Sequence, residues 1–503
     1  MIDSLMGSLK AQLALLDSNT QQERTDFGYI SLQTPIEQSV PLIAATMNES
    51  FFLTKPDSGF SLLGLGSILT LQAKGSNRLK SIKSDYSKIL NKWFNKKQIP
   101  PIAFLAFAFD ENDPMTGSWE QFPNTLLTVP AVMIKEINSC QSLQINIQLD
   151  QTTYDNNFKH IKQLLNRYLK QVEQLTNLSK EITRVNLNTR QASAESLSPA
   201  KGFSSAEGSL SAESSLSAKG SLSAKGSWQT LSRNAITQIK SGNLDKLVTS
   251  RKQSLQTQNS ISVPGLMQKL AKHYPACTIF NYQLSGKNIV SASPERLLTL
   301  QHPDIQSDAI GGTIQRKKQQ GNNRSSAKSA FLPLFFKQSL FQTEPEAAES
   351  KKLLKEHAFI TQDIYQRLDP LCNTLKMPIS PILMKLHNLY HLETPIQGKL
   401  MPEYDLFDVI ETLHPTPAVA GFPAHEARQW LLENENYHRG WYTGAFGWLD
   451  GNHDGELFVM LRCALIKDKQ VDLFAGAGLV AESEPEIEWQ ETELKMQTIL
   501  EML

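Results

Sequence analysis

The chain has 503 residues, and its 50 basic and 50 acidic side chains cancel at neutral pH. This balance gives no reason to expect a nucleic acid or an anionic membrane surface as a partner. Hydrophobic residues make up 40% of the chain, which is ample for a large core and for two or three domains. Any binding driven by charge must therefore be local.

Four cysteines lie far apart, at positions 140, 277, 372 and 463, and form no Cys-x-x-Cys pair. This spacing argues against a disulfide framework and against a structural zinc site. The first residues lack the basic start and apolar centre of a signal peptide, and the longest apolar stretch, 102–109, is too short to span a bilayer. We therefore expect a cytoplasmic protein.

Residues 1–190 are expected to form the N-terminal part of the fold. Short apolar runs alternate with turn signals from about 25 to 150, which predicts strands, and residues 158–175 keep the apolar spacing of a core-facing helix. Residues 191–227 shift to Ser, Ala, Gly, Lys and Glu with a six-residue repeat. Such a segment has too little apolar surface to fold alone, so it is interpreted as a linker or insertion.

A helix is predicted from Trp228 to Ile239, followed by a strand in which Lys246 lies opposite the apolar face. Alone, this pattern is typical of an ordinary edge lysine. A hairpin is predicted over 277–298, and Glu295 follows Pro294 where the strand ladder must break. Glu295 is either a salt-bridge partner of a neighbouring arginine or an acid held at the interruption.

Gly311 and Gly312 mark either a plain turn or a close approach of backbone to a ligand. A helix through residues 352–364 carries Glu356 next to His357, which alone is a weak metal signal. A strand is predicted over 457–466 with Arg462 in its middle. A buried arginine is costly unless it meets an anion, so Arg462 points to an acidic ligand.

The end of the chain combines a strand and turn, 473–480, with an acidic helix, 484–495. Glycines at 476 and 478 let backbone N–H groups approach an anion. Ser483 and Glu486 have the spacing of a capping box, so Glu484 and Glu486 are interpreted as helix-start residues. Glu488 and Glu491 lie one turn apart beyond them. From the residues alone, a solvated helix face is favoured over a metal site.

Taken together, these motifs resemble the chorismate-utilising enzymes, which include anthranilate synthase large subunits, isochorismate synthases and salicylate synthases. The match runs from about Trp228 to the C-terminus, whereas the first 190 residues match only loosely, around 107–110, Trp119 and Phe122. The motifs, in family order, lie at residues 246–251, 293–296, 312–313, 356–357, 391–394, 475–478 and 488–492.

Residues 414–419 and 439–444 resemble the isochorismate synthase branch, and its menaquinone-pathway members more than its siderophore members. Lys246 supports this branch, because anthranilate enzymes carry glutamine there and use ammonia from a glutaminase partner. No glutaminase subunit is therefore expected. The alternatives are a salicylate synthase, an ammonia-dependent anthranilate-type synthase and, in a different class, an inactive chorismate-binding paralogue.

The resemblance implies an α/β fold of the α+β type, in which large antiparallel sheets pack face to face with helices outside, as in anthranilate synthase component I. Residues 228–503 are expected to form the chorismate-binding catalytic region, with chorismate as the substrate, in a monomer or weak homodimer. The implied reaction adds water at C2 of chorismate and expels the C4 hydroxyl. By similarity Lys246 is the base, which requires a lowered pKa, and Glu295 is the acid, which requires a raised pKa.

The resemblance also implies a Mg²⁺ cofactor. Glu356 and Glu491 are the expected ligands, with Glu488 bound directly or through water. Further residues are expected to bind substrate: Arg462, Lys495 and the N–H groups of Gly476 and Gly478 at its carboxylates, Gly312 and Thr313 through backbone, and His391 and His414 as pocket-lining or structural residues. Gly311 departs from the alanine usual in the family, which leaves the backbone contact intact.

Overall fold

The computed structural model describes residues 28–36, 50–149, 218–315, 344–385 and 389–503, together with the single residues 7, 11, 42, 163, 166, 167 and 170. The last four of these single residues are helical, in the range where a helix was predicted. Residues 191–217 of the predicted linker lie outside the described residues, and so do residues 316–343. Helix α5 begins at Ala218 and therefore extends into the segment that was predicted to be a linker.

The larger sheet has 11 strands, and every neighbouring pair in it is antiparallel. N-terminal and C-terminal strands join where β2 pairs with β10. In spatial order the strands are β1 (Gly28–Ile36), β8 (Cys140–Leu149), β7 (Val132–Ile137), β3 (Phe60–Leu65), β2 (Ser50–Lys55), β10 (Thr278–Leu284), β11 (Lys287–Ser293), β20 (Cys463–Lys467), β21 (Gln470–Leu479), β9 (Lys246–Gln256) and β17 (Gly421–Phe422).

The second sheet has 10 strands and is also antiparallel throughout. It too combines both parts of the chain, because β5 pairs with β18. Its order is β14 (Cys372–Lys376), β16 (Leu389–Leu400), β13 (Asp304–Gln315), β12 (Arg296–Gln301), β19 (Gly455–Val459), β18 (Ala445–Asp450), β5 (Ile102–Phe107), β6 (Thr125–Val129) and β4 (Leu69–Ala73), and β15 (Ile382–Lys385) pairs with β16.

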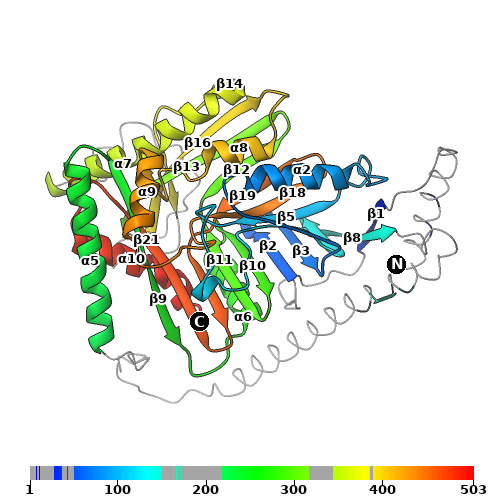
Figure 1. The fold of residues 1–503 in the computed structure, drawn as a ribbon, viewed down its shortest axis with the longest axis horizontal. Coiled ribbons are helices and arrows are strands. Elements are labelled where there is room, and N and C mark those ends of the chain that lie inside the picture. Colours follow the sequence, from blue (N-terminus) through cyan, green and yellow to red (C-terminus); the bar gives the residue numbers. More distant parts are fainter. Residues whose placement is uncertain are drawn as a thin grey trace, which may run out of the picture.

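The two sheets pack face to face through an aromatic-rich core, in which Phe280 of the larger sheet stacks on Phe446 of the second at 4.2 Å between ring centroids. Helices cover the outer faces (Figure 1). On the larger sheet lie α6 (Val263–His273), α10 (Pro485–Leu500) and α5 (Ala218–Lys240); on the second lie α2 (Arg78–Leu90), α7 (Glu344–Leu368) and α8 (Leu406–Leu413), and α9 (Ala424–Asn434) packs by β17 and β9. This arrangement confirms the predicted fold class.

The chain crosses between the sheets at two neighbouring places. Strands β11 and β12 follow each other but belong to different sheets, and so do β19 and β20. The two crossings run side by side, since β11 pairs with β20 and β12 pairs with β19. The break predicted at Glu295 is confirmed, because β11 ends at Ser293 and β12 begins at Arg296. The continuous strand predicted over 457–466 is wrong, because the chain leaves one sheet for the other between β19 and β20.

Among the described residues, no helix combines the length and the apolar character needed to cross a membrane.

Candidate active site

A cavity of about 70 Å³ lies beside the two crossings and gathers most of the predicted site residues. Its walls come from β9, β13, β21, α7 and α10, and from the two crossing segments. Residues more than two hundred positions apart therefore meet in one place. The predicted residues that line it are Lys246, Glu295, Gly312, Glu356, His391, Arg462, Gly476, Gly478, Glu491 and Lys495.

Lys246 opens strand β9 and is not an ordinary edge lysine, because its side chain is only 1% exposed. A buried ammonium needs a partner, and Glu356 of α7 supplies one at 3.1 Å. Gly478 lies beside this ion pair. A Cβ at Gly478 would collide with Oε1 of Glu356 and lie 3.0 Å from Cε of Lys246. The absence of a side chain at 478 is thus what leaves room for the pair.

Glu295 lies at the first crossing, between the end of β11 and the start of β12. Its backbone carbonyl accepts a hydrogen bond from Val459 N, which ties it to the second crossing. Burial raises the pKa of its carboxyl to about 8, against the opposing charges of Lys246 and Lys495. The neighbouring arginine does not neutralise it, because Arg296 pairs with Asp308 and Glu456. The salt-bridge alternative for Glu295 is therefore wrong.

Arg462 lies at the second crossing rather than in the middle of a strand, with a left-handed backbone at φ +47°. Its guanidinium is buried and donates to Thr498 Oγ1 at 3.1 Å and to His391 Nε2 at 2.8 Å. Because Nε2 of His391 accepts, Nδ1 carries the hydrogen and donates to Gly312 O at 3.3 Å. Burial, Arg462 and Lys495 hold the pKa of His391 well below its usual range. The ring is a neutral support for the arginine.

Gly312 is not in a turn. It occupies a β-bulge within β13, with φ +71°, where the pairing with β16 shifts. Thr313 pairs with His391 in the register of the two strands. Gly311 has ordinary backbone, and a Cβ there would meet Cδ1 of Ile360 from α7.

Gly476 and Gly478 also lie in a strand, β21, so the strand predicted within 473–480 is confirmed and the turn at its glycines is wrong. Across from them on β9, the N–H groups of Ser250 and Val248 point away to Glu435 Oε1 and Ala420 O. Both glycines therefore sit in non-hydrogen-bonded pairs and turn their own N–H and C=O groups away from β9. The pairing of β20 with β21 ends at Phe474. After Phe474, this edge of β21 faces the cavity. The predicted binding of a substrate carboxylate by the N–H groups of Gly476 and Gly478 requires this orientation.

Lys495 is held at two points on the wall formed by α10 and β21. Its Nζ donates to Gly476 O at 2.9 Å and pairs with Glu491 Oε1 at 2.7 Å. Glu488, one turn before Glu491, is 2% exposed and does not line the cavity. Its carboxylate pairs instead with Lys352 of α7 at 2.6 Å. Burial and the charge of Glu491 raise the pKa of Glu488 to about 7.

The start of α10 differs from the prediction. The N-cap is Glu484, which makes no side-chain cap, and Ser483 Oγ accepts from Val480 N. The predicted capping box is therefore wrong, because Ser483 closes the turn before the helix. Glu486 does lie in the first turn, but its carboxylate binds Lys225 and Gln229, which joins α10 to α5.

His414 does not line the cavity. Its Nε2 lies 3.1 Å from Thr443 O, and its ring packs edge-on against Phe107. Burial and Arg78 lower the pKa of His414 to about 3. His414 is therefore a neutral, structural residue, and the expectation that it lines the pocket is wrong.

Several lining residues were not singled out from the sequence. Tyr442, Thr443 and Val419 form part of the wall and lie within the two motifs that suggested the branch, so those motifs were the available signal. The hydroxyl of Tyr442 approaches Gly476, where a Cβ would lie 3.1 Å from it. The other lining residues not predicted are Val248, Pro294, Ile310, Ala418, Leu461, Phe474 and Ala475, whereas Gly311 had been singled out together with Gly312.

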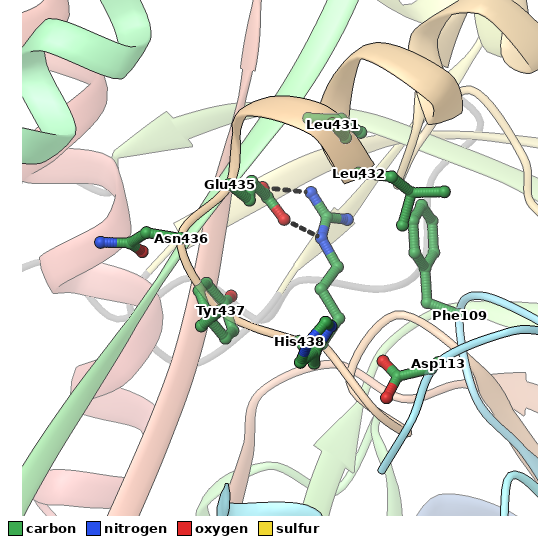
Figure 2. A pocket seen from close by; sticks show the side chains of 9 residues that line it. Phe109, Asp113, Leu431, Leu432, Glu435, Asn436, Tyr437 and His438 are labelled. Carbon is green, nitrogen blue, oxygen red and sulfur yellow. Dashed lines mark hydrogen bonds and ion pairs between the residues drawn. The ribbon is translucent and has the colours of Figure 1, made fainter. Parts of the chain in front are cut away.

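Figure 2 shows the residues that line a second cavity, of about 270 Å³. Arg439 lines this cavity, and its guanidinium is bound by Glu435 at 2.6 and 2.7 Å. Arg439 also donates to Val419 O and Thr443 Oγ1, and so fixes two residues of the first cavity. None of the predicted site residues lines the second cavity. Its remaining lining residues are Phe109, Asp113, Leu431, Leu432, Asn436, Tyr437 and His438.

Comparison with known proteins covers nearly the whole chain. The family model described as "Chorismate binding enzyme" matches residues 14–199 and 188–503. The chain is 26% identical to isochorismate synthase MenF of Bacillus subtilis over 463 residues, which are 90% of this chain and 87% of that protein. It is 33% identical to isochorismate synthase EntC of Escherichia coli over 258 residues, which are 51% of this chain and 62% of that protein.

Solved structures share the fold. MenF, the menaquinone-specific isochorismate synthase of Escherichia coli, superposes with a TM-score of 0.66 at 21% identity, covering 98% of this chain and 99% of that one. Anthranilate synthase component I of Streptococcus pneumoniae gives 0.58 at 16% identity, covering 97% and 96%. With the family model matched along both parts of the chain, this protein belongs to the chorismate-binding enzymes.

Proposed function

We propose that the protein is an isochorismate synthase, which converts chorismate to isochorismate by adding water at C2 and expelling the C4 hydroxyl. The observation that carries the proposal is that Lys246 and Glu295, both buried, line one cavity together with Arg462 and Lys495. Such a cavity offers a base, an acid and two cations to a substrate with two carboxylates. Family membership and the names of the relatives support the same reaction.

Glu295 is assigned the role of general acid. Its pKa of about 8 keeps the carboxyl protonated at neutral pH, so a proton is available for the departing C4 hydroxyl, which leaves as water. Its position at the crossing fixes the direction of the carboxyl, because the backbone on both sides belongs to paired strands.

Lys246 is assigned the role of general base. The ammonium that pairs with Glu356 must first lose a proton, and the neutral amine then takes a proton from the water that attacks C2, while the ring double bonds shift and the C4–O bond breaks. The proton gained by Lys246 and the proton lost by Glu295 balance the reaction. Glu356 holds the Lys246 side chain in place at 3.1 Å, and the glycine at 478 leaves space for this arrangement.

Arg462 and Lys495 are assigned to the substrate carboxylates, with the N–H groups of Gly476 and Gly478 beside them. Arg462 is suited to this role because two of its donors are used by Thr498 and His391, which orient the guanidinium and leave further donors for a ligand. Lys495 is suited because Gly476 O and Glu491 fix its ammonium at the cavity wall.

Magnesium is the proposed cofactor, held by Glu356 and Glu491. Among the described residues, no group of three or more His, Cys, Asp or Glu side chains could hold a metal ion by itself. The two glutamates on the cavity wall nevertheless fit Mg²⁺, which prefers hard oxygen donors, needs few protein ligands and keeps several waters. When bound, the ion would neutralise a substrate carboxylate that must lie close to these glutamates.

The pathway is proposed to be menaquinone biosynthesis, in view of the likeness to MenF along most of the chain. Independence from a glutaminase subunit belongs to the same proposal, because the base position holds Lys246. A cytoplasmic location is also proposed.

The decisive experiment mixes purified protein with chorismate and Mg²⁺ and resolves the products by chromatography. Isochorismate is the expected product, and its absence would overturn the proposal. Pyruvate released together with salicylate would identify a salicylate synthase. A product formed only when ammonium is supplied would identify an anthranilate-type enzyme. Chorismate bound without turnover would identify an inactive paralogue.

A further inference from the structure

Three glutamates and three lysines form three ion pairs, two of them on the cavity wall. Each carboxylate is bound by one ammonium, and the six side chains come from β9, α7 and α10. We call Glu356, Glu488 and Glu491 the glutamate cluster. Its ion pairs are Lys246 with Glu356 at 3.1 Å, Lys495 with Glu491 at 2.7 Å and Lys352 with Glu488 at 2.6 Å.

Lys352 is the lysine of the three that the proposed reaction does not use. It precedes Glu356 by four residues on α7, so the two side chains lie on the same face of that helix. From there it reaches across to Glu488 on α10, whose side chain is 2% exposed. Neither Lys352 nor Glu488 lines the cavity. This ion pair therefore lies behind the two glutamates that face the substrate.

The charge of Lys352 acts on the whole glutamate cluster. Burial disfavours its charged form, yet Glu488, and after it Glu356 and Glu491, raise the pKa of Lys352 above its usual value. Geometry agrees with this, because Lys352 contacts Glu488 directly, precedes Glu356 by one helical turn, and Glu488 in turn precedes Glu491 by one turn. In a protein without bound metal, the Lys352 ammonium offsets the repulsion that three neighbouring carboxylates exert on one another.

We propose that Lys352 is the resident counter-cation of the glutamate cluster, holding Glu488 in an ion pair and weakening the affinity of Glu356 and Glu491 for a divalent cation. This inference rests on the proposed magnesium site. A positive charge beside the site repels the incoming ion, so the ion is held firmly only when the substrate carboxylate adds its own negative charge. Lys352 acts through other residues and is a positioning residue, not a catalytic one.

The test compares divalent-cation binding by the wild type and by Lys352→Met, which keeps the length of the side chain and removes its charge. Mg²⁺ binding is measured by calorimetry and Mn²⁺ binding by electron paramagnetic resonance, both without chorismate. We expect Lys352→Met to bind both ions on the order of tenfold more tightly. We also expect the metal-free variant to unfold at a lower temperature than the wild type, because Glu488 loses its partner.

Lys355→Met is the matched control. Lys355 lies three residues further along α7, and its pair with Glu482 is exposed on both sides, at 51% and 58%. The Lys355→Met variant loses the same charge from the same helix. Its affinity for both ions and its melting temperature are nevertheless expected to stay at wild-type values. Equal tightening in both variants would overturn the inference, because it would show a general charge effect. Unchanged or weaker binding by Lys352→Met would overturn it too.

A second set of variants keeps the inference testable if Lys352→Met does not fold. Glu488→Gln leaves Lys352 unopposed and is expected to weaken Mn²⁺ binding, whereas adding Lys352→Met to it is expected to restore wild-type affinity within about twofold. No recovery in the double variant would overturn the inference, and so would a wild type that binds neither ion. Failure of the proposed function would show separately, as absence of isochorismate from the wild type.

Discussion

Glu295 and Glu356 line the same cavity, and the difference between them lies in their neighbours. Glu356 has an ammonium 3.1 Å away, whereas Glu295 forms no ion pair within the described part of the chain and is buried where two strands change sheet. Burial without a close partner favours the neutral acid, and a close lysine favours the anion. The same side chain therefore suits proton donation at one position and cation binding at the other.

The largest effect is expected from Lys246→Ala, which removes the proposed base. Turnover should fall on the order of 10³-fold, while Mg²⁺ binding is kept or becomes tighter, because Glu356 remains and no longer has an ammonium beside it. Initial rates of isochorismate formation and calorimetry with Mg²⁺ measure the two quantities. Lys252→Ala, at an exposed position of the same strand, is the control and should keep full activity. Unchanged turnover in Lys246→Ala would favour the inactive paralogue.

Glu295→Gln tests the acid directly, since glutamine keeps the shape and cannot donate the proton. We expect turnover to fall on the order of 10² to 10³-fold. In the wild type, activity should decline as the pH rises through about 8, where Glu295 loses its proton. A pH–rate profile checks this. Activity that continues to rise well above pH 8 would contradict the assignment.

Stability measurements give an independent check on Glu295. Its pKa is raised in the folded state, so the unfolded chain releases this proton near the ordinary pKa of glutamate, while the folded protein keeps it until about pH 8. The wild type should therefore lose stability relative to Glu295→Gln as the pH rises from about 4.5 to 8, and the difference should then level off. Denaturant unfolding at pH 5, 7 and 9 measures it.

Arg462→Lys should raise KM for chorismate by about tenfold and change kcat less. A lysine cannot hold Thr498 and His391 together and still present a paired donor to a carboxylate. Steady-state kinetics separates the two parameters. An equal fall in kcat with no change in KM would instead place Arg462 in the chemical step.

Gly478→Ala should lower kcat by about tenfold, with the fold intact. The added methyl would displace Glu356 and press on Lys246, which disturbs the base and the cation site together. Gly311→Ala is the comparison, because its methyl would meet the end of the flexible Ile360 side chain. Activity within about twofold of wild type is expected there. Equal defects at both positions would argue against a special role for 478.

The sequence predicted the types of the site residues better than their surroundings. Ten of the predicted residues meet at one cavity. Eight of them lie in the motifs of the family resemblance, whereas Arg462 was singled out by its place in an apolar strand and Lys495 lies just beyond the last motif. The two crossings were missed, since an apolar run reads the same whether a strand continues in one sheet or enters another. Ser483 and Glu486 matched a capping box by spacing, but the hydroxyl bonded back to Val480. Lys352 carried no local signal, because its partner lies 136 residues later.

The side-by-side crossings have one further consequence. The acid at 295 and the arginine at 462 are each anchored to both sheets, so their separation depends on how closely the sheets pack. Phe280 and Phe446 stack in the aromatic core between the sheets and do not line the cavity, so conservative changes there touch no residue with a proposed chemical role. Such changes are nevertheless expected to lower the catalytic rate even where the melting temperature stays the same, because the rate depends on the spacing between the sheets.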